Sequence, residues 1–433
     1  MHINNTSIKK IPPSEISYYQ IKIIEKSKTR KNWNKGLAEI QYVYNQQNQA
    51  KTISRNLLFY TDTNTIKLIS EGDILLVSCK VSQIKNKGNP GEFNSTLYWE
   101  SKRTSLLTFF DYTDFSILKN KPPGLKESIQ KSLNKTLHQY LPKNQVGLAK
   151  ALFLGDKSSL STETTNAFSA AGGMHLLAIS GLHIGLMIVV LLNFFRFFSR
   201  IISRYQATMI VLLFIWIYAY LIGFPPSVVR SVFMFSLITM GSLIGSQNNQ
   251  INLLCFSAII LLLINPWYLF DIGFQLSYLA MAGILLTYSS IRLFIPFKNK
   301  IVRFLWNGTA LGLSAQIFTV PLCLYYFHQF PNYFALTNLG IILISGVLIS
   351  LGASLFFFSW SPLLCIGIGT VLSLLLYTLV YFVHWIEHLP GSVAKGFDFS
   401  TVDLTLFYII IISVLLLVFL RKYYVLKYLI IAA

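Results

Sequence analysis

Residues 169–187 read SAAGGMHLLAISGLHIGLM, an apolar run into which small and polar residues are set. These residues are Gly172, Gly173, His175, Ser180, Gly181, His183 and Gly185. Glycines four positions apart let membrane helices approach closely, and glycine with serine can also mark a broken membrane helix. Ionisable side chains at membrane depth usually face a protein interior or a watery path. The stretch therefore predicts the start of a membrane-embedded bundle whose polar residues face inward.

The composition extends this interpretation to most of the chain. Of 433 residues, 53% are hydrophobic and 12% are charged, whereas a soluble domain carries roughly 25% charged residues. The composition therefore argues against an ordinary soluble enzyme. Apolar runs of membrane-spanning length predict a polytopic α-helical membrane protein with about nine spans, over residues 166–433. The predicted spans are 174–195, 207–224, 227–245, 251–269, 272–291, 304–325, 333–358, 363–386 and 402–420.

Basic residues in short loops predict the orientation. They follow the first, fifth and ninth predicted spans, as at Arg196, Arg292 and Arg421. Because cytoplasmic loops are enriched in Lys and Arg, these loops are predicted to be cytoplasmic and the N-terminal domain extracytoplasmic. No cleavable signal peptide opens the chain, so we also expect an N-terminally incomplete form of a longer protein. The alternative is that the span count is wrong by one and this domain is cytoplasmic.

The N-terminal part, residues 1–110, alternates in the manner of short strands. Five are predicted: YYQIKIIE at 18–25, AEIQYVYN at 38–45, RNLLFY at 55–60, TIKLI at 65–69 and DILLVSCKVSQI at 73–84. Five strands at this spacing indicate an all-β, OB-like barrel, a fold that binds single-stranded nucleic acid through basic and aromatic side chains. The predicted DNA-binding residues are Lys22, Lys28, Arg30, Lys31, Trp33 and Lys35. The alternative is ordinary strand aromatics beside a solvated basic face.

A connector, residues 111–165, joins the two parts. Leu125, Ile129, Leu133 and Leu137 recur every four residues, with lysines elsewhere on the turn. This spacing predicts a basic amphipathic helix that lies on the lipid surface or packs on the bundle.

Two patterns suggest catalysis, and neither is complete. Ser180 and His183 share a helical face, as a serine nucleophile and its base would, but no nearby carboxylate orients the histidine. His384, Glu387 and His388 spell H-x-x-E-H, a metallopeptidase pattern. No glutamate follows as a third ligand, and we interpret the match as an interfacial cluster. We therefore expect no enzymatic activity, cofactor or metal, with an intramembrane metal-dependent hydrolase as the alternative.

Several polar residues lie within the predicted spans. Arg230 is one turn into the third span, where it either snorkels to the interface or forms a cation in the path of an anionic polymer. Asp271 is placed to cap the fifth span, with Gln275 one turn below it. Gln316 and Asn338 are further polar points. The predicted orientation places six polar residues in the outer half of the membrane, namely His175, Arg230, Asp271, Gln275, Asn338 and His384. Their shared depth suggests a polar vestibule that opens outward, although satisfied hydrogen bonds between helices would give the same pattern.

Four blocks in this order resemble the ComEC family of competence proteins. They are GMHLLAISGLHIGLM at 173–187, PPSVVRSVFM at 225–234, NPWYLFDIGFQLSYLAMAGILL at 265–286 and QIFTVPLCLYYFHQFPNYFALTNLG at 316–340. The N-terminal GDILLVSCKV at 72–81 and KGNPGEFN at 87–94 resemble the family's extracytoplasmic OB-type domain. The resemblance covers about residues 18–388.

The resemblance implies an inner-membrane channel that passes single-stranded DNA into a bacterial cell during natural transformation. Residues at the family's polar positions are His175, Ser180, Gly181, His183, Arg230, Asp271, Gln275, Ser277, Gln316 and Asn338. Implied partners are a periplasmic or surface DNA receptor, a cytoplasmic DNA helicase or translocase, the lipid bilayer and further copies of the chain. Full-length members carry additional N-terminal helices and many carry a C-terminal metallo-β-lactamase-like domain. A nonfunctional truncated remnant or a small-solute transporter therefore stays an alternative.

Overall fold

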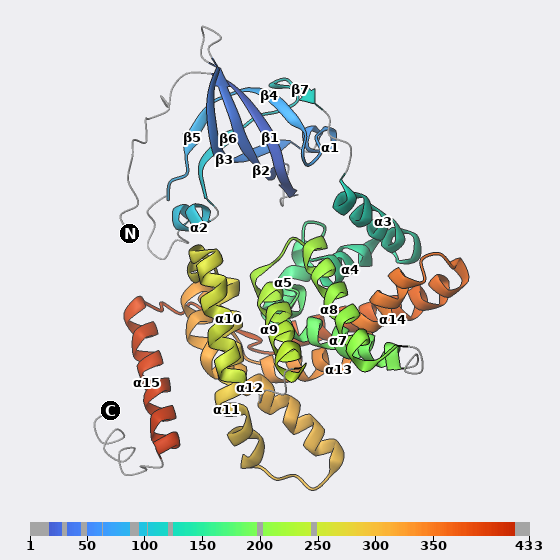
Figure 1. Ribbon diagram of the computed structural model, residues 1–433. Coiled ribbons are helices and arrows are strands. Elements are labelled where there is room, and N and C mark those ends of the chain that lie inside the picture. Colours follow the sequence, from blue (N-terminus) through green and yellow to red (C-terminus); the bar gives the residue numbers. More distant parts are fainter. Residues whose placement is uncertain are drawn as a thin grey trace. The chain divides into compact units, whose positions relative to one another are not determined.

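The computed structural model describes residues 17–27, 33–44, 50–62, 64–86, 95–101, 103–119, 124–196, 202–243 and 249–420 (Figure 1). Two compact units, Met1–Lys131 and Ser132–Ala433, divide the chain. The first unit is built on a β-sheet and the second is helical. The predicted change from strands to membrane-type helices is confirmed.

The first unit contains a seven-stranded sheet in the order β5-β6-β3-β2-β1-β4-β7. Its strands are β1 (Ser17–Ser27), β2 (Trp33–Tyr44), β3 (Ala50–Asp62), β4 (Ile74–Cys79), β5 (Val81–Gln83), β6 (Thr104–Phe109) and β7 (Phe115–Lys119). Neighbouring strands are antiparallel except β3 and β6, which are parallel. Only Lys80 separates β4, which pairs with β1, from β5, which pairs with β6.

Strand alternation builds the core of this unit. Tyr19, Ile21 and Ile23 of β1 are buried while the residues between them are not, as a period of two requires. Cys79 is also buried, and burial raises the pKa of its thiol to about 11. The thiol is therefore protonated and unreactive at neutral pH, in the manner of a small apolar residue.

One predicted strand is wrong, and two strands, β6 and β7, were not predicted. TIKLI forms a single helical turn, α1 (Thr65–Leu68). Asp62 Oδ1 accepts a hydrogen bond from the Thr65 amide at 2.9 Å, and the three-residue spacing of Ile66 and Ile69 buries both side chains. The missed strand β6 follows another short helix, α2 (Ser95–Ser101).

The second unit consists of helices joined by short connections. Those before the first long apolar helix are α3 (Leu125–Tyr140), which begins in the first unit, α4 (Lys143–Leu154), α5 (Thr162–Ala170) and α6 (Met174–Leu177). The next are α7 (Gly181–Arg196), α8 (Arg204–Leu221), α9 (Pro226–Leu243), α10 (Gln250–Ile264) and the 3₁₀ helix η1 (Pro266–Phe270). The last are α11 (Ile272–Phe294), α12 (Lys300–Phe327), α13 (Phe334–Phe357), α14 (Pro362–Glu387) and α15 (Thr401–Leu420). A two-stranded ribbon pairs β8 (Gln329–Pro331) with β9 (Val393–Lys395).

Helices occupy all nine predicted spans, but their lengths differ. Within the described residues, five helices are long and apolar enough to cross a membrane: α8, α11, α12, α13 and α14. The apolar parts of α7, α9, α10 and α15 are shorter. The first predicted span, 174–195, is wrong as a single helix, because the chain leaves helical geometry between Leu177 and Gly181.

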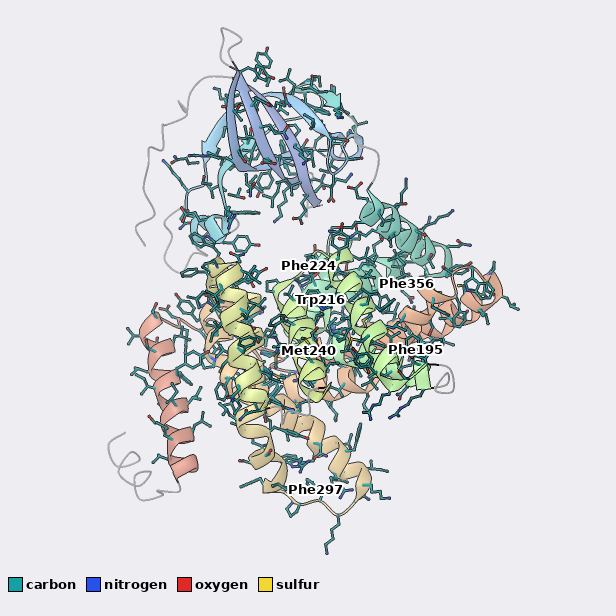
Figure 2. All side chains as sticks on the ribbon, viewed as in Figure 1. Phe195, Trp216, Phe224, Met240, Phe297 and Phe356 are labelled. Atoms are coloured by element: carbon teal, nitrogen blue, oxygen red, sulfur yellow. The ribbon has the colours of Figure 1, made fainter. Side chains whose placement is uncertain are left out.

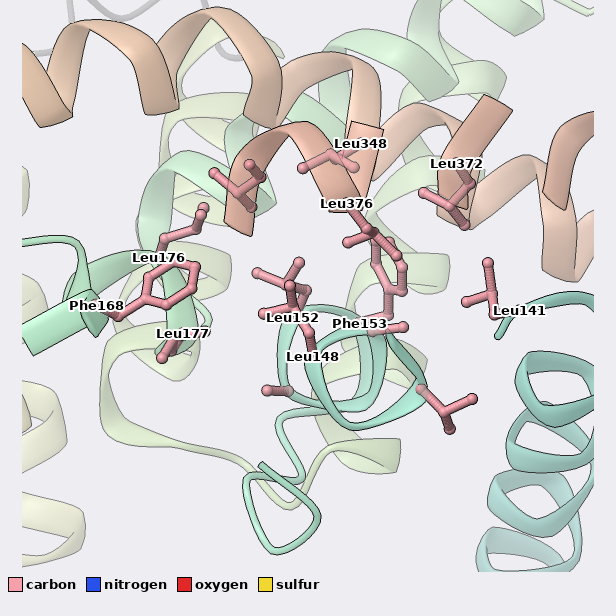
Figure 3. Packing of buried hydrophobic residues seen from close by; sticks show 14 of the residues in the cluster. Leu141, Leu148, Leu152, Phe153, Phe168, Leu176, Leu177, Leu348, Leu372 and Leu376 are labelled. Atoms are coloured by element: carbon pink, nitrogen blue, oxygen red, sulfur yellow. The ribbon is translucent and has the colours of Figure 1, made fainter. Parts of the chain in front are cut away.

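The main core of the second unit lies where α4, α5 and α6 meet α13 and α14 (Figure 3). Leu148, Leu152 and Phe153 of α4 are buried against Leu348 and Leu376 of the long helices. This packing fixes the segment just before the break between α6 and α7.

Close helix contacts hold the remainder of the bundle. At Gly283 of α11, an added Cβ would meet the backbone oxygen of Ser314 on α12, so only glycine permits this approach. Phe297 lies in the connection between α11 and α12 (Figure 2). Its ring packs edge-on against the Trp306 ring, with the ring centres 6.0 Å apart. Between α8 and α9, Trp216 Nε1 donates to Ser236 Oγ at 3.2 Å.

Candidate functional site

The side chain of His183 caps the break before α7. The Ser180 amide donates to His183 Nδ1 at 3.2 Å, and Ser180 Oγ lies 2.9 Å from the same nitrogen. A histidine thus takes the place that Glu or Gln has in a capping box. Because Nδ1 accepts, the ring proton is on Nε2, a buried atom without a hydrogen-bond partner in the described structure. The Ser–His pair is formed, but its geometry is that of a helix cap.

Arg230 is the buried cation of this region. Its side chain is only 7% exposed, so it does not snorkel to the surface of the bundle. Its guanidinium lies 5.7 Å from the centre of the Tyr278 ring, and Nη2 donates to Ser231 Oγ at 3.3 Å. Its Nε is buried without a partner, and among the described residues no acid forms an ion pair with it. A buried charge without an opposite charge is costly, which makes this arrangement unusual for a purely structural residue.

Small residues bring α9 against the break. Ser227 Oγ donates to the Ile179 carbonyl at 2.9 Å, and Ser231 Oγ donates to the Ser227 carbonyl at 2.8 Å. A Cβ added at Gly181 would lie 2.7 Å from Ser231 Oγ and 2.9 Å from Arg230 Nη2. Gly181 therefore makes room for the guanidinium beside the first turn of α7.

The predicted residues of α11 form a second group. Asp271 Oδ1 accepts from the Phe274 amide at 2.8 Å, which confirms the predicted cap. Gln275 Nε2 donates to the Leu269 carbonyl at 2.7 Å and thereby secures η1. Ser277 is half-buried on the next turn, beside Tyr278, the residue that contacts Arg230.

Gln316 and Asn338 belong to a third place, where α12 meets α13. The Asn338 amide lies 3.1 Å from the position of a Cβ at Gly312, one turn before Gln316. Asn338 Oδ1 is buried without a partner, and Gln316 is half-buried. His175 is exposed, and its Nδ1 lies 3.1 Å from the Gly172 carbonyl.

The structure thus joins Ser180, Gly181, His183 and Arg230 in one site, whereas the other predicted residues make their described contacts elsewhere in the bundle. Sequence reasoning missed Ser227, Ser231 and Tyr278, all of which contact this group. The spacing of the two serines could have revealed them, since Ser227 and Ser231 are four residues apart and so share a helical face with each other.

In the first unit, three aromatic side chains form what we call the aromatic patch: Trp33, Tyr60 and Phe109. Trp33 and Phe109 are 49% and 55% exposed. The rings of Tyr60 and Phe109 stack at 5.3 Å, and Trp33 meets Phe109 edge-on at 5.8 Å. Three different strands supply these residues, which makes the patch a feature of the folded sheet.

Of the described basic side chains, Lys35 lies beside the patch. Lys35 pairs with Tyr60 across β2 and β3, and its Nζ lies 5.7 Å from the Trp99 ring. Arg55 and Lys85 line a separate groove of about 630 Å³, with Glu100. Lys22 is half-buried on β1. The predicted residues Lys28, Arg30 and Lys31 lie outside the described residues.

The profile of the family described as Competence protein matches residues 152–421. This is more than half of the chain and includes every predicted residue of the bundle. The chain belongs to the ComEC family of competence proteins. The membership confirms the resemblance carried by the four blocks between 173 and 340.

Curated relatives agree with membership of the competence protein family. The chain is 33% identical over 259 residues to ComE operon protein 3 of Bacillus subtilis (strain 168), covering 57% of this chain and 32% of that protein. It is 27% identical over 231 residues to Recombination protein 2 of Haemophilus influenzae, covering 49% of this chain and 29% of that protein. The matched segment thus spans about a third of these competence relatives. No solved structure matches the chain.

Proposed function

We propose that this chain conducts single-stranded DNA across the inner membrane of a bacterium during natural transformation. The observation that carries the proposal is Arg230, a buried guanidinium with no acidic partner among the described residues. A phosphodiester would supply the missing negative charge, and the planar guanidinium matches phosphate oxygens in geometry. Because the chain belongs to the competence protein family, we identify the phosphodiester as that of DNA.

The surroundings of Arg230 fit a passing ligand better than a permanent one. Tyr278 and Ser231 hold the guanidinium through weak contacts at 5.7 and 3.3 Å. A permanent ion pair would neutralise the charge of the guanidinium, and the attraction between the guanidinium and a phosphate would then be weak. We therefore assign Arg230 to the translocation path, with Ser180, Gly181 and His183 as the residues that shape its surroundings.

For the remaining polar residues, we propose a place along the same path. Asp271 and Gln275 fix the entrance to α11, while Ser277, Gln316, Asn338 and His175 offer polar side chains from other helices. Asn338 retains a buried oxygen without a partner in the described structure, so it can accept a hydrogen bond from a ligand.

We propose an extracytoplasmic OB-type barrel for residues 1–110. The bent β4–β5 segment, which pairs with β1 at one end and with β6 at the other, supports a closed sheet. The parallel β3–β6 pair allows six strands to close in the order β1-β2-β3-β6-β5/β4. The aromatic patch and Lys35 would receive single-stranded DNA, the aromatic rings by stacking on bases and Lys35 by contact with a phosphate. In the proposed domain order, a connector of residues 111–165 follows the barrel, and the nine-span membrane domain of residues 166–433 follows the connector.

Other proteins complete the proposed pathway. The chain shows no phosphate-binding loop of the G-x-x-x-x-G-K-[ST] type, so a cytoplasmic DNA helicase or translocase would supply the energy. A periplasmic or surface receptor would deliver the DNA, and further copies of the chain can contribute to the pore. The chain itself would act without cofactor or enzymatic activity.

Uptake of labelled DNA by cells carrying Arg230→Met tests the proposal. Removing an unpaired buried charge leaves packing intact and relieves a desolvation cost, so the variant should insert and remain stable. We expect uptake to fall at least tenfold. Arg292→Met is the matched control, because Arg292 also lies over a tyrosine ring, at 5.9 Å, but is exposed. Normal uptake by a correctly inserted Arg230→Met protein would remove Arg230 from the path.

A further inference from the structure

Three side chains of metal-ligating types meet at the C-terminal end of α14. His384 and Glu387 lie in the last turn of the helix, and His388 caps it. One ligand atom from each of the three side chains lies within 4.8 Å of the others. None of the three is buried: the side chains of His384 and Glu387 are 26% and 29% exposed, and His388 is exposed.

The hydrogen bonds of the cluster orient its ligand atoms. His388 Nδ1 lies 2.7 Å from the His384 carbonyl oxygen, so this nitrogen carries the proton and donates it. The lone pair of His388 Nε2 is then free for a metal, an orientation that metal-binding histidines commonly use. His384 Nδ1 lies 3.0 Å from Glu387 Oε2. Two ligands of one tetrahedral zinc ion are about 3.3 Å apart, given bonds of roughly 2.0–2.1 Å.

We propose that His384, Glu387 and His388 bind one divalent transition-metal ion, with zinc as the best match. Two imidazoles and one carboxylate suit zinc, whereas magnesium and calcium prefer six or more oxygen ligands. Three protein ligands leave a fourth position of the tetrahedron for water. The proposal concerns metal binding at this cluster and is independent of DNA transport.

The position of the cluster gives the metal a structural role. The turn that follows α14 is attached to the start of α13, because Tyr333 Oη donates to the Pro390 carbonyl at 2.9 Å and Asn332 Nδ2 donates to the Gly391 carbonyl at 2.7 Å. Beyond this turn, β9 pairs with β8. A metal on His384, Glu387 and His388 fixes the last turn of α14 and so the start of this connection. Binding to the folded state alone stabilises it in proportion to metal concentration.

Zinc titration of the tag-free, full-length chain in detergent tests the site, with a chromophoric chelator as competitor. We expect one zinc equivalent per chain and a zinc-dependent rise in Tm. His388→Gln and Glu387→Gln should each weaken binding at least tenfold and abolish the rise in Tm. Cobalt in place of zinc should give the visible absorption of a tetrahedral site in the unmodified chain only.

His328→Gln is the matched control. His328 is another helix-capping histidine, its Nδ1 lies 3.1 Å from the Phe397 carbonyl, and it is remote in sequence from the cluster. This variant should bind zinc like the unmodified chain. Circular dichroism before metal addition verifies that each variant is folded. Absence of zinc binding by the unmodified chain, or equal binding by folded His388→Gln and Glu387→Gln, would overturn the proposal.

Discussion

At the scale of single residues, Gly181 offers a direct test of the Arg230 site. Gly181→Ala places a methyl group 2.9 Å from Arg230 Nη2 and 2.7 Å from Ser231 Oγ. Overpacking of this kind costs about 1–3 kcal/mol, and the guanidinium must move. We expect DNA uptake to fall about tenfold, the change in binding that corresponds to roughly 1.4 kcal/mol.

The control for this substitution is one helical turn away. A Cβ at Gly185 would meet only the Phe235 ring, at 3.5 Å or more, which is an ordinary contact. Gly185→Ala should retain full uptake, and alanine's helix propensity should raise the thermal stability of the purified protein slightly. Equal losses in the two variants would mean that helix packing, and not the guanidinium, decides activity.

The identity of Arg230 as a special residue could be predicted, but its environment could not. A lone arginine after PPSVV was visible in the sequence, with snorkelling as the alternative. Its 7% exposure and its contact with Tyr278 depend on how α9 meets α11. Helical periodicity identifies residues that share one face of a helix, but it does not identify which face of another helix they meet.

At the scale of elements, two substitutions of Asp271 distinguish its role as the cap of α11 from a role of its negative charge in DNA uptake. Asp271→Asn keeps an oxygen that can accept from the Phe274 amide, whereas Asp271→Ala removes it, at a cost of about 0.5–2 kcal/mol. We expect Asp271→Asn to show normal uptake and Tm, and Asp271→Ala to show a lower Tm. If Asp271→Asn abolished uptake without a change in Tm, the negative charge itself would be required.

The aromatic patch gives a prediction for the sheet. Stacking of a base on an aromatic side chain contributes about 1–3 kcal/mol. Trp33→Ala and Phe109→Ala should therefore each weaken binding of an oligothymidine to the full-length chain by about fivefold or more, measured by fluorescence anisotropy. Tyr112→Ala is the control, because Tyr112 is 65% exposed but has no ring contact among those of the described residues. Equal weakening by Tyr112→Ala would argue against the patch as the contact site.

Helices and strands were predicted correctly where the hydrophobic pattern fits only one repeat, two residues for a strand or 3.6 for a helix. The alternation in YYQIKIIE and the apolar runs that form α8, α11, α12, α13 and α14 were predicted correctly, whereas the apolar parts of α9 and α10 are shorter than the spans predicted for them. The strand predicted for TIKLI is wrong because a five-residue segment fits both the period of two of a strand and the period of 3.6 of a helix. A helical turn forms there, and Asp62 Oδ1 accepts a hydrogen bond from the Thr65 amide at its start. The break between α6 and α7 was suggested by Gly and Ser at 180–181, but the Ser180–His183 cap that stabilises it needs the folded turn.

At the scale of the whole molecule, the division into a sheet unit and a helical unit followed from two features of the sequence, the strand-like alternation before residue 85 and the long apolar runs after residue 170. The formal net charge of +19 indicates attraction to a polyanion. It does not say which lysines and arginines contact DNA. The strand pairing that places Lys35 beside Tyr60 links residues 25 positions apart in the sequence, so no local pattern could reveal it.

The salt dependence of DNA binding by the intact chain distinguishes charge from stacking. Each phosphate contact contributes about −0.7 to the slope of log K against log salt concentration for a single strand. We expect a slope of about −2 or steeper, which Lys35→Gln makes shallower by roughly 0.7 as it removes one contact. Trp33→Ala should lower the affinity at every salt concentration and leave the slope unchanged, because a stacked base releases no counterion. A slope that Lys35→Gln does not alter would exclude Lys35 from phosphate contact, while a loss confined to Trp33→Ala would leave stacking as the main contribution of this surface.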